Sequence, residues 1–279
     1  MKIGVSAFAW TTRFTKRHLE LLPSIREHGL LGFEIGMFDP SQLPAKEIRQ
    51  ACESYHLDVS VCAILPADVN PISPDAEVRK HARAHLLHCI ETASEMGAHL
   101  ICGPVYAPIG YLPGRRRNSE EWNWAVECFQ SLGNTLDGHA MTLAIEPVNR
   151  SETFFLNTAS EASDLCDAIG HPRVGATIDT FHANIEEKNL PAAVDTLGPL
   201  LKHLHVSEND RGLVGSGHVD FAGIVQVLRR IEYRGCLMIE GFGYSPNEAA
   251  SLGALWGDLT VTPEDIAFRG VEYLRKLLD

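Results

Sequence analysis

Four apolar segments in the second half of the chain each end in a residue that can bind a metal ion. They are residues 141–146, 176–179, 203–205 and 237–240, and they end at Glu146, Asp179, His205 and Glu240. Short apolar runs bounded by turn residues are typical of buried strands, and Pro147 ends the first of them because it has no amide hydrogen to donate. One ligand from each strand end converges on a single ion only if the four strands are parallel neighbours.

The remainder of the chain continues this alternation of strands and helices. Strands are expected at 2–8, 32–36, 57–63, 98–103, 141–146, 173–179, 201–207 and 235–240, with helical segments between them, among them 16–28, 75–96, 119–136, 158–169, 190–197, 220–231 and 262–278. Eight strands alternating with helices predict a (β/α)8 TIM barrel, and 279 residues suit one such domain spanning 1–279. In this fold, active sites lie at the C-terminal ends of the strands.

Charge and cysteine content narrow the class of protein. A net charge of −12 repels phosphate backbones and argues against a nucleic-acid partner. The seven cysteines are scattered without a Cys-x-x-Cys pair, which suggests neither a disulfide framework nor a structural zinc. The early apolar run 3–10 is better interpreted as a strand than as a signal peptide, and no run approaches membrane-spanning length. A reduced, cytoplasmic protein is expected.

The residue types at the four strand ends indicate which metal they would bind. A single acid at the end of a strand is more often the N-cap of the following helix than a metal ligand. Three carboxylates and one imidazole at equivalent positions favour a metal site instead. Hard oxygen ligands with one imidazole suit Mn²⁺, Mg²⁺ or Co²⁺ better than a thiolate-preferring ion.

Further polar residues stand at short offsets from these positions and complete a recognisable pattern. The matching segments are Ile145-Glu-Pro-Val-Asn-Arg-Ser-Glu152, Asp179-Thr-Phe-His182, His205-Val-Ser-Glu-Asn-Asp-Arg211, Gly215-Ser-Gly-His218 and Ile239-Glu240. With them the whole chain resembles the xylose isomerase-like sugar epimerase and isomerase superfamily, and within it the ketose 3-epimerases of the D-tagatose and D-psicose (D-allulose) type.

The resemblance implies a role for each matching residue. Glu146, Asp179, His205 and Glu240 would hold one divalent metal, with Mn²⁺ expected first and Co²⁺ or Mg²⁺ as alternatives. Glu146 and Glu240 would also be the catalytic acid and base. The substrate's oxygens at C1 to C3 would contact Glu152, His182 and Arg211.

The activity that follows is metal-dependent C3 epimerisation of free ketoses such as D-tagatose, D-fructose, D-psicose or L-ribulose. Removing a proton beside a carbonyl and returning one to the opposite face requires two opposed bases, and a metal stabilises the intermediate enediolate charge. Members of the family assemble as dimers or tetramers, so a homodimer or homotetramer is expected.

Other functions are compatible with the same barrel. An aldose-ketose isomerase of the hydroxypyruvate isomerase type, or an inosose dehydratase, would have nearly the same metal site. An abasic-site endonuclease shares the Asp179-x-x-His182 spacing but needs extra histidines after the third and fourth strands, where this chain has Ala63-Ile-Leu and Gly103-Pro-Val. A non-catalytic sugar-binding barrel would not need two opposed carboxylates.

Phe8 and a run of three arginines each allow two roles. Phe8 follows the first strand and is expected either to form an apolar wall for the substrate's distal carbons or to fill the core. Arg115, Arg116 and Arg117 lie in the long loop 104–118, where a solvated lid or a subunit contact is favoured over a phosphate-binding site, because no glycine-rich phosphate cradle accompanies them.

Three further residues are expected to be structural. Cys62 and Cys102 are interpreted as unreactive core residues, since neither has a base placed beside it in the sequence. His203 is expected to point away from His205, either into packing or towards the surface.

Overall fold

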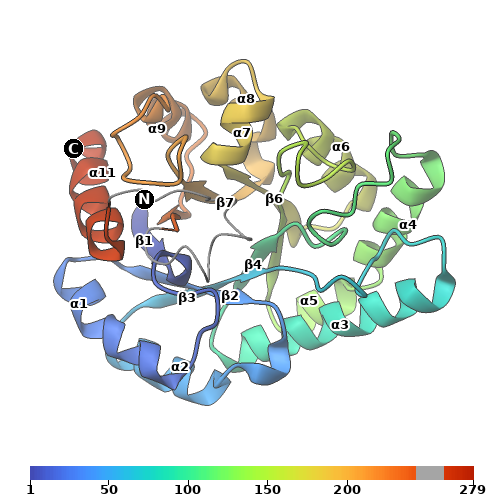
Figure 1. Ribbon diagram of the computed structural model, residues 1–279, viewed down its shortest axis with the longest axis horizontal. Helices are drawn as coiled ribbons and strands as arrows, with labels where there is room; N and C mark the ends of the chain where they lie inside the picture. Colours follow the sequence, from blue (N-terminus) through green and yellow to red (C-terminus); the bar gives the residue numbers. More distant parts are fainter. Residues whose placement is uncertain (243–260) are drawn as a thin grey trace.

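Eight parallel strands form a closed barrel in the computed structural model, which describes residues 1–242 and 261–279 (Figure 1). In chain order the strands are β1 (Lys2–Ser6), β2 (Gly32–Met37), β3 (Asp58–Ala63), β4 (Leu100–Gly103), β5 (Thr142–Ile145), β6 (Val174–Asp179), β7 (Leu201–Val206) and β8 (Cys236–Ile239). Each strand pairs with the next along the chain, and β8 pairs with β1 to close the sheet. The predicted TIM barrel is confirmed.

Helices surround the strands on the outside of the barrel (Figure 1). They are η1 (Ala7–Ala9), η2 (Lys16–Leu21), α1 (Leu22–Glu27), η3 (Pro40–Gln42), α2 (Ala45–Ser54), α3 (Ala76–Glu95), α4 (Ser119–Gln130), α5 (Gly133–Gly138), α6 (Ala159–Ile169), α7 (Thr180–Glu186), α8 (Leu190–Leu197), η4 (Gly198–Leu200), α9 (Phe221–Arg230), η5 (Asp265–Arg269) and α11 (Gly270–Leu278). The single helix expected over 16–28 is a 3₁₀ turn followed by an α-helix, because Pro23 lacks an amide hydrogen and suits only the first turn of a new helix.

The two faces of the strands bury different kinds of side chain. Successive residues of a strand point to opposite faces. Outward-pointing residues such as Phe33, Ile35 and Val61 pack against the helices in the main hydrophobic core. A small apolar cluster is separate from this core, and it consists of Phe8, Cys62, Cys102, Ala144 and Phe242. The barrel interior therefore has room for polar groups beside a short apolar wall.

Local sequence places the strand ends that carry the predicted ligands. Glu146 extends β5 by one residue, since its amide donates to the Gly103 carbonyl at 3.1 Å, and Pro147 follows. Asp179 ends β6 and also caps α7, because its Oδ1 accepts from the Phe181 amide at 2.8 Å. Asp179 can therefore cap α7 and still lie at the mouth of the barrel.

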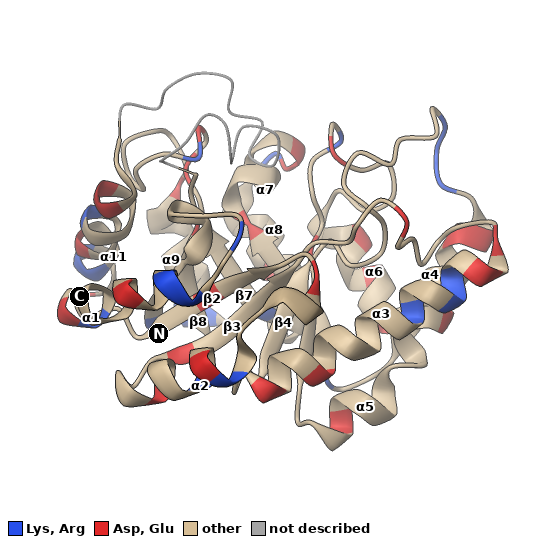
Figure 2. Ribbon diagram, turned by 60° about the horizontal axis from the view of Figure 1, so that its bottom comes forward, with Lys and Arg blue, Asp and Glu red and all other residues tan. Residues whose placement is uncertain are grey.

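Charged residues of both signs lie along the outer helices (Figure 2). The longest helix, α3, carries acidic and basic residues on its exposed face. In the described ranges 1–242 and 261–279, no helix is both long and apolar enough to span a membrane.

We expect Gly103→Ala to destabilise the fold by about 2–4 kcal/mol. Gly103 has a φ of 126°, and a Cβ there would lie 2.2 Å from the Ala63 carbonyl oxygen, a backbone atom that cannot move without distorting β3. Urea unfolding followed by circular dichroism measures the change. Gly138→Ala is the control: it lies in α5 with nothing within 4 Å of a new Cβ, and it should be neutral or stabilising. Equal midpoints for the two variants would contradict this account.

Candidate metal centre and active site

The four predicted ligands meet at the C-terminal mouth of the barrel, and all four are buried. Nδ1 of His205 lies 3.6 Å from Oε1 of Glu146 and 3.7 Å from Oε1 of Glu240. The ligand atoms of Glu146, Asp179 and His205 lie within 4.8 Å of one another. Strands β5 to β8 therefore bring one nitrogen and three carboxylates to a common point, as the sequence predicted.

The donor atoms of this cluster fit one divalent cation. Nδ1 of His205 is buried and has no hydrogen-bond partner in the part of the chain that the structure describes. Unpaired buried polar atoms are uncommon in folded proteins. A cation among the carboxylates of Glu146, Asp179 and Glu240 would engage this nitrogen and offset their charge. Oxygen donors with one imidazole suit Mn²⁺, Mg²⁺ or Co²⁺.

The titration of the cluster reflects its excess of negative charge. Burial raises the pKa of Asp179 to about 7; the Arg211 guanidinium opposes this shift, and the Glu240 carboxylate adds to it. Burial alone would lower the pKa of His205, but the carboxylates of Glu240 and Glu34 hold that pKa well above its ordinary value. Nη1 of Arg211 donates to Asp179 at 2.9 Å and to Glu240 at 2.8 Å. The cluster thus attracts positive charge, of which Arg211 supplies part.

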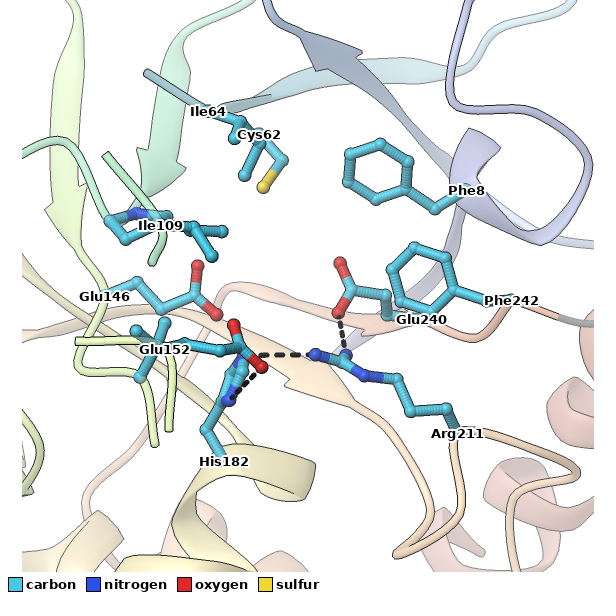
Figure 3. Close-up of a pocket in the computed structure, with 12 residues that line it drawn as sticks. Phe8, Cys62, Ile64, Ile109, Glu146, Glu152, His182, Arg211, Glu240 and Phe242 are labelled. Carbon is cyan, nitrogen blue, oxygen red and sulfur yellow. Dashed lines mark hydrogen bonds and ion pairs between the residues drawn. The ribbon is translucent and has the colours of Figure 1, made fainter. Parts of the chain in front are cut away.

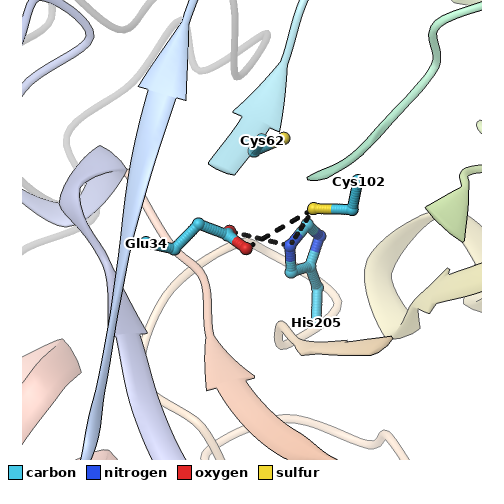
Figure 4. A group of neighbouring side chains, drawn as sticks. All are labelled: Glu34, Cys62, Cys102 and His205. Carbon is cyan, nitrogen blue, oxygen red and sulfur yellow. Dashed lines mark hydrogen bonds and ion pairs between the residues drawn. The ribbon is translucent and has the colours of Figure 1, made fainter. Parts of the chain in front are cut away.

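A buried glutamate on β2, Glu34, orients the ring of His205 from inside the barrel (Figure 4). Its Oε1 lies 2.9 Å from Nε2 of His205, and its Oε2 lies 2.9 Å from Nε2 of His203. Ser60 donates to Oε2 at 2.9 Å. Burial would raise the pKa of Glu34, but the charges of and hydrogen bonds from the two histidines outweigh it and hold the pKa well below its ordinary value. An ionised carboxylate only accepts hydrogen bonds, so Nε2 of His205 carries the proton and Nδ1 faces the cluster.

Sequence analysis missed Glu34 and misplaced His203. The available signal was a single charged residue, Glu34, between Phe33 and Ile35 in an otherwise apolar strand. Since those two neighbours pack outward against the helices, alternation places the glutamate on the barrel interior. The expectation that His203 points away from His205 is wrong, because residues two apart on a strand share a face. Both rings are buried against the same carboxylate.

The residues predicted to bind substrate line a cavity beside the cluster (Figure 3). Its lining includes Phe8, Glu152, His182 and Arg211 together with both glutamates of the metal cluster. Nη2 of Arg211 lies 3.1 Å from Nε2 of His182. The guanidinium of Arg211 also lies over the ring of Phe181, 4.0 Å from its centre, which fixes its orientation.

Burial controls the charge of two of these polar groups. The pKa of Glu152 is raised, mainly by burial, although Arg211 and the amide of Asn149 oppose the shift. Burial and the neighbouring positive charge of Arg211 hold the pKa of His182 well below its ordinary value. The cavity therefore presents a neutral imidazole and a carboxyl group that protonates more readily than usual, both suited to hydrogen bonds with hydroxyl groups.

Phe8 belongs to the small interior cluster and also lines the cavity. It is buried, and its ring stacks on Phe242 with centres 5.5 Å apart while meeting Phe38 edge-on. The same ring lines the cavity on the side opposite Glu152 and His182 (Figure 3). It is therefore part of an apolar wall and of the small interior cluster at once.

Two of the three arginines in the loop 104–118 form ion pairs away from the cavity. Nη2 of Arg115 lies 2.6 Å from Glu121, and Nη1 of Arg117 lies 2.7 Å from Glu161. Arg117 also lies over the ring of Trp122. Within the described residues, none of the three loop arginines lines the cavity.

Comparison with known proteins places these features in a wider group. Residues 22–277 match the xylose isomerase-like TIM barrel family. A probable ketose 3-epimerase from Synechocystis sp. is 28% identical over 99% of this chain and 96% of that protein. A 3-dehydro-D-guloside 4-epimerase from Escherichia coli is 35% identical over 86% of this chain and 92% of the length of that protein. The crystal structure of a D-allulose 3-epimerase from Methylomonas sp. in complex with D-allulose has a TM-score of 0.92 at 26% identity, covering 99% of this chain and 96% of that one.

We expect Glu34→Gln to weaken Mn²⁺ binding about 10- to 100-fold, because a neutral amide no longer fixes the His205 ring or raises its basicity. Isothermal titration with Mn²⁺ measures the affinity. Glu121→Gln is the matched control, since Glu121 is also a buried glutamate but pairs with Arg115 away from the cluster. An unchanged Mn²⁺ affinity in Glu34→Gln would show that the hydrogen bond does not support the site.

Proposed function

Because this chain belongs to the xylose isomerase-like TIM barrel family, we propose that it is a ketose 3-epimerase that works with one divalent cation. The observation that carries the proposal is the placement of two carboxylates. Glu146 and Glu240 enter the same cavity from opposite sides (Figure 3), and each lies within 4 Å of the histidine nitrogen. This arrangement suits the removal of a proton from one face of a carbon and the return of a proton to the other.

Epimerisation at C3 then needs only proton transfers by the two glutamates. One carboxylate takes the proton from C3, and the electron pair of the broken C–H bond moves into the C2–C3 bond as the C2 oxygen gains negative charge. The other glutamate, in its protonated form, gives a proton to C3 from the opposite face, as the C2–C3 double bond supplies the electron pair and the C2 carbonyl re-forms. Exchange with water resets both groups, and the reverse reaction exchanges their roles. Such positioned acid–base groups contribute roughly 10²- to 10⁴-fold each.

The bound cation would stabilise the negative charge that develops on the substrate oxygens, a contribution of several kcal/mol in typical sites. The chain's own residues would orient the sugar. Glu152, His182 and Arg211 line one side of the cavity and offer acceptors and donors to the hydroxyl groups near C1 to C3. Phe8 and Phe242 cover the other side and exclude water from the reacting carbon.

Charge distribution supports a free rather than a phosphorylated ketose. Arg211 is the one basic residue other than histidine among those that line the described cavity, and it already pairs with Asp179 and Glu240. Arg115 and Arg117 pair with Glu121 and Glu161. A phosphate would therefore meet carboxylates without a free cation to neutralise it.

Deuterium incorporation tests the proposed reaction. The Mn²⁺-loaded protein is incubated in D₂O with D-fructose, D-tagatose, D-psicose or L-ribulose, the metal is removed, and proton NMR locates the label. We expect deuterium at C3 and accumulation of the C3 epimer. Deuterium at C1 with an aldose product would instead indicate an aldose-ketose isomerase and would refute the epimerase proposal.

The 35% identity to a 3-dehydro-D-guloside 4-epimerase supports a second candidate, epimerisation at C4 of a glycoside that carries a ketone at C3. The chemistry is the same, since the proton removed again lies beside a carbonyl. The substrate differs in being a ring-closed glycoside. Deuterium at C4 of a 3-keto glycoside, with no label in any free ketose, would favour this candidate.

We expect Glu146→Gln and Glu240→Gln each to lower the turnover number by roughly 10²- to 10⁴-fold at saturating Mn²⁺. Each variant keeps one of the two bases, so each should still exchange the C3 proton of one epimer with D₂O without forming the other. The two variants should differ in which epimer they label. Mn²⁺ titration separates loss of metal from loss of proton transfer, and Glu121→Gln serves as the control. Near-normal epimerisation in both variants would contradict the assignment.

We expect removal of the metal by a chelator to abolish turnover, and Mn²⁺, Co²⁺ or Mg²⁺ to restore it, with Mn²⁺ the most effective. The physical reason is that three buried carboxylates repel one another unless a cation lies between them. Rates after dialysis and re-addition measure this effect. Full activity in the chelated protein, with metal analysis showing none bound, would exclude a metal-dependent mechanism.

We further propose that the protein assembles as a homodimer or homotetramer. Light scattering, which measures the mass in solution, tests this proposal.

A further inference from the structure

A second cluster of potential metal ligands lies inside the barrel on the other side of His205. It consists of Glu34, Cys62, Cys102 and His205, and all four are buried (Figure 4). Their ligand atoms lie within 4.8 Å of one another. The strand pairing explains why: Cys62 on β3 and Cys102 on β4 are register partners, so both side chains project into the barrel side by side.

The distances within this cluster approach those of a tetrahedral zinc site. Zinc–ligand bonds of about 2.0–2.3 Å place neighbouring ligand atoms roughly 3.3–3.8 Å apart in a tetrahedron. Sγ of Cys102 lies 3.4 Å from Oε2 of Glu34 and 3.6 Å from Nε2 of His205. Oε1 of Glu34 lies 2.9 Å from the same nitrogen. Sγ of Cys62 lies within 4.8 Å of the other three ligand atoms, so the four donors enclose an ion once that sulfur moves closer and the carboxylate and imidazole move apart.

We propose that Cys62, Cys102, Glu34 and Nε2 of His205 form a second metal site that takes a soft divalent cation of the zinc type. Two thiolates, one imidazole and one carboxylate are donors that zinc accepts and that Mn²⁺ or Mg²⁺ does not favour. The first cluster offers oxygens around Nδ1 of the same ring. His205 would therefore bridge a hard-ligand site and a soft-ligand site, one at each nitrogen.

The surroundings meet the other requirements of a metal site. Ser60 and His203 hold Glu34 in place through hydrogen bonds to Oε2, which supplies the outer support that metal ligands need. Cys62 lines the cavity that also contains Glu146 and Glu240, so an ion entering the cavity reaches the thiols. On binding, each thiol releases its proton to solvent. Nε2 of His205 also releases the proton that it shares with Glu34, so that their hydrogen bond gives way to one metal bond from each group.

The proposal stands apart from the epimerase function, because it concerns binding alone and needs no substrate. Cobalt is the probe: bound by thiolate it shows an intense sulfur-to-metal charge-transfer band in the near ultraviolet, whereas bound by oxygen and nitrogen alone it does not. The Mn²⁺-loaded protein is titrated with CoCl₂ under a reductant that does not bind metals. We expect the band to appear, to saturate at one cobalt per chain, and to disappear when Zn²⁺ is added.

Cys102→Ala should remove the band and lower the affinity for this cobalt at least about 100-fold. Cys89→Ala is the matched control, since Cys89 is also buried but lies on α3 outside the barrel, and it should keep the band. Circular dichroism establishes that each variant folds, and Cys62→Ala replaces Cys102→Ala if that protein does not.

Two outcomes would overturn the proposal. One is the absence of any charge-transfer band in the parent protein, or a band that persists in Cys102→Ala. The other is a parent protein that binds no cobalt at the thiols and whose mass before reduction is lower by two hydrogens, which would mean that the register partners form a disulfide instead.

Discussion

The structure depends on how buried charges inside a closed barrel are compensated. An ionised side chain that leaves water without a partner costs far more than a small domain's net stability. Here Glu34 is matched by two histidines, and Arg211 contacts both Asp179 and Glu240. These pairs leave a surplus of negative charge around Nδ1 of His205. A divalent cation is the simplest group that would remove the surplus, and the same carboxylates would act as the bases in the proposed proton transfers.

The scaffold makes such a polar interior possible. A closed parallel sheet pairs all its strands, so none of the barrel's strand backbones is left as an open edge. The apolar side chains required for stability point outward to the helices, which leaves the inside available for ligands. One residue of the site has a strained backbone. Arg211 has a φ of 61°, and two hydrogen bonds hold it there: its amide donates to the Glu208 carbonyl, and its carbonyl accepts from the Phe242 amide.

His205 links the parts of the site that have different chemical character. Its Nδ1 faces the oxygen donors at the mouth, and its Nε2 faces Glu34 and the thiol of Cys102 below. A change on one side of the ring therefore alters the charge and orientation presented to the other. The proposed soft-ligand site and the proposed catalytic site would thus be coupled through a single imidazole, although they prefer different metals.

The barrel and the positions of the proposed ligands could be predicted from the sequence because they depend on local patterns. Short apolar runs ending in Glu146, Asp179, His205 and Glu240 indicate parallel strands whose C-terminal ends share one edge, and in the structure these four side chains lie together at that edge. Resemblance to a family then supplied roles for Glu152, His182 and Arg211, which line the cavity together. The helix expected over 16–28 was less accurate, because Pro23 divides it into a 3₁₀ turn and a short α-helix.

What lies across the barrel interior was decided by tertiary structure alone. Glu34 and His205 are 171 residues apart and meet only because the sheet closes and turns both side chains inward. The pairing of Cys62 with Cys102 depends on the register between β3 and β4, which no local pattern specifies. Chain order and residue type determined the mouth of the barrel, where β5 to β8 each contribute a residue at or next to the C-terminal end of the strand. Closure of the sheet and the register of its strands determined the interior layer formed by Glu34, Cys62, Cys102 and His205. The contacts in this layer join strands that come together only in the folded barrel.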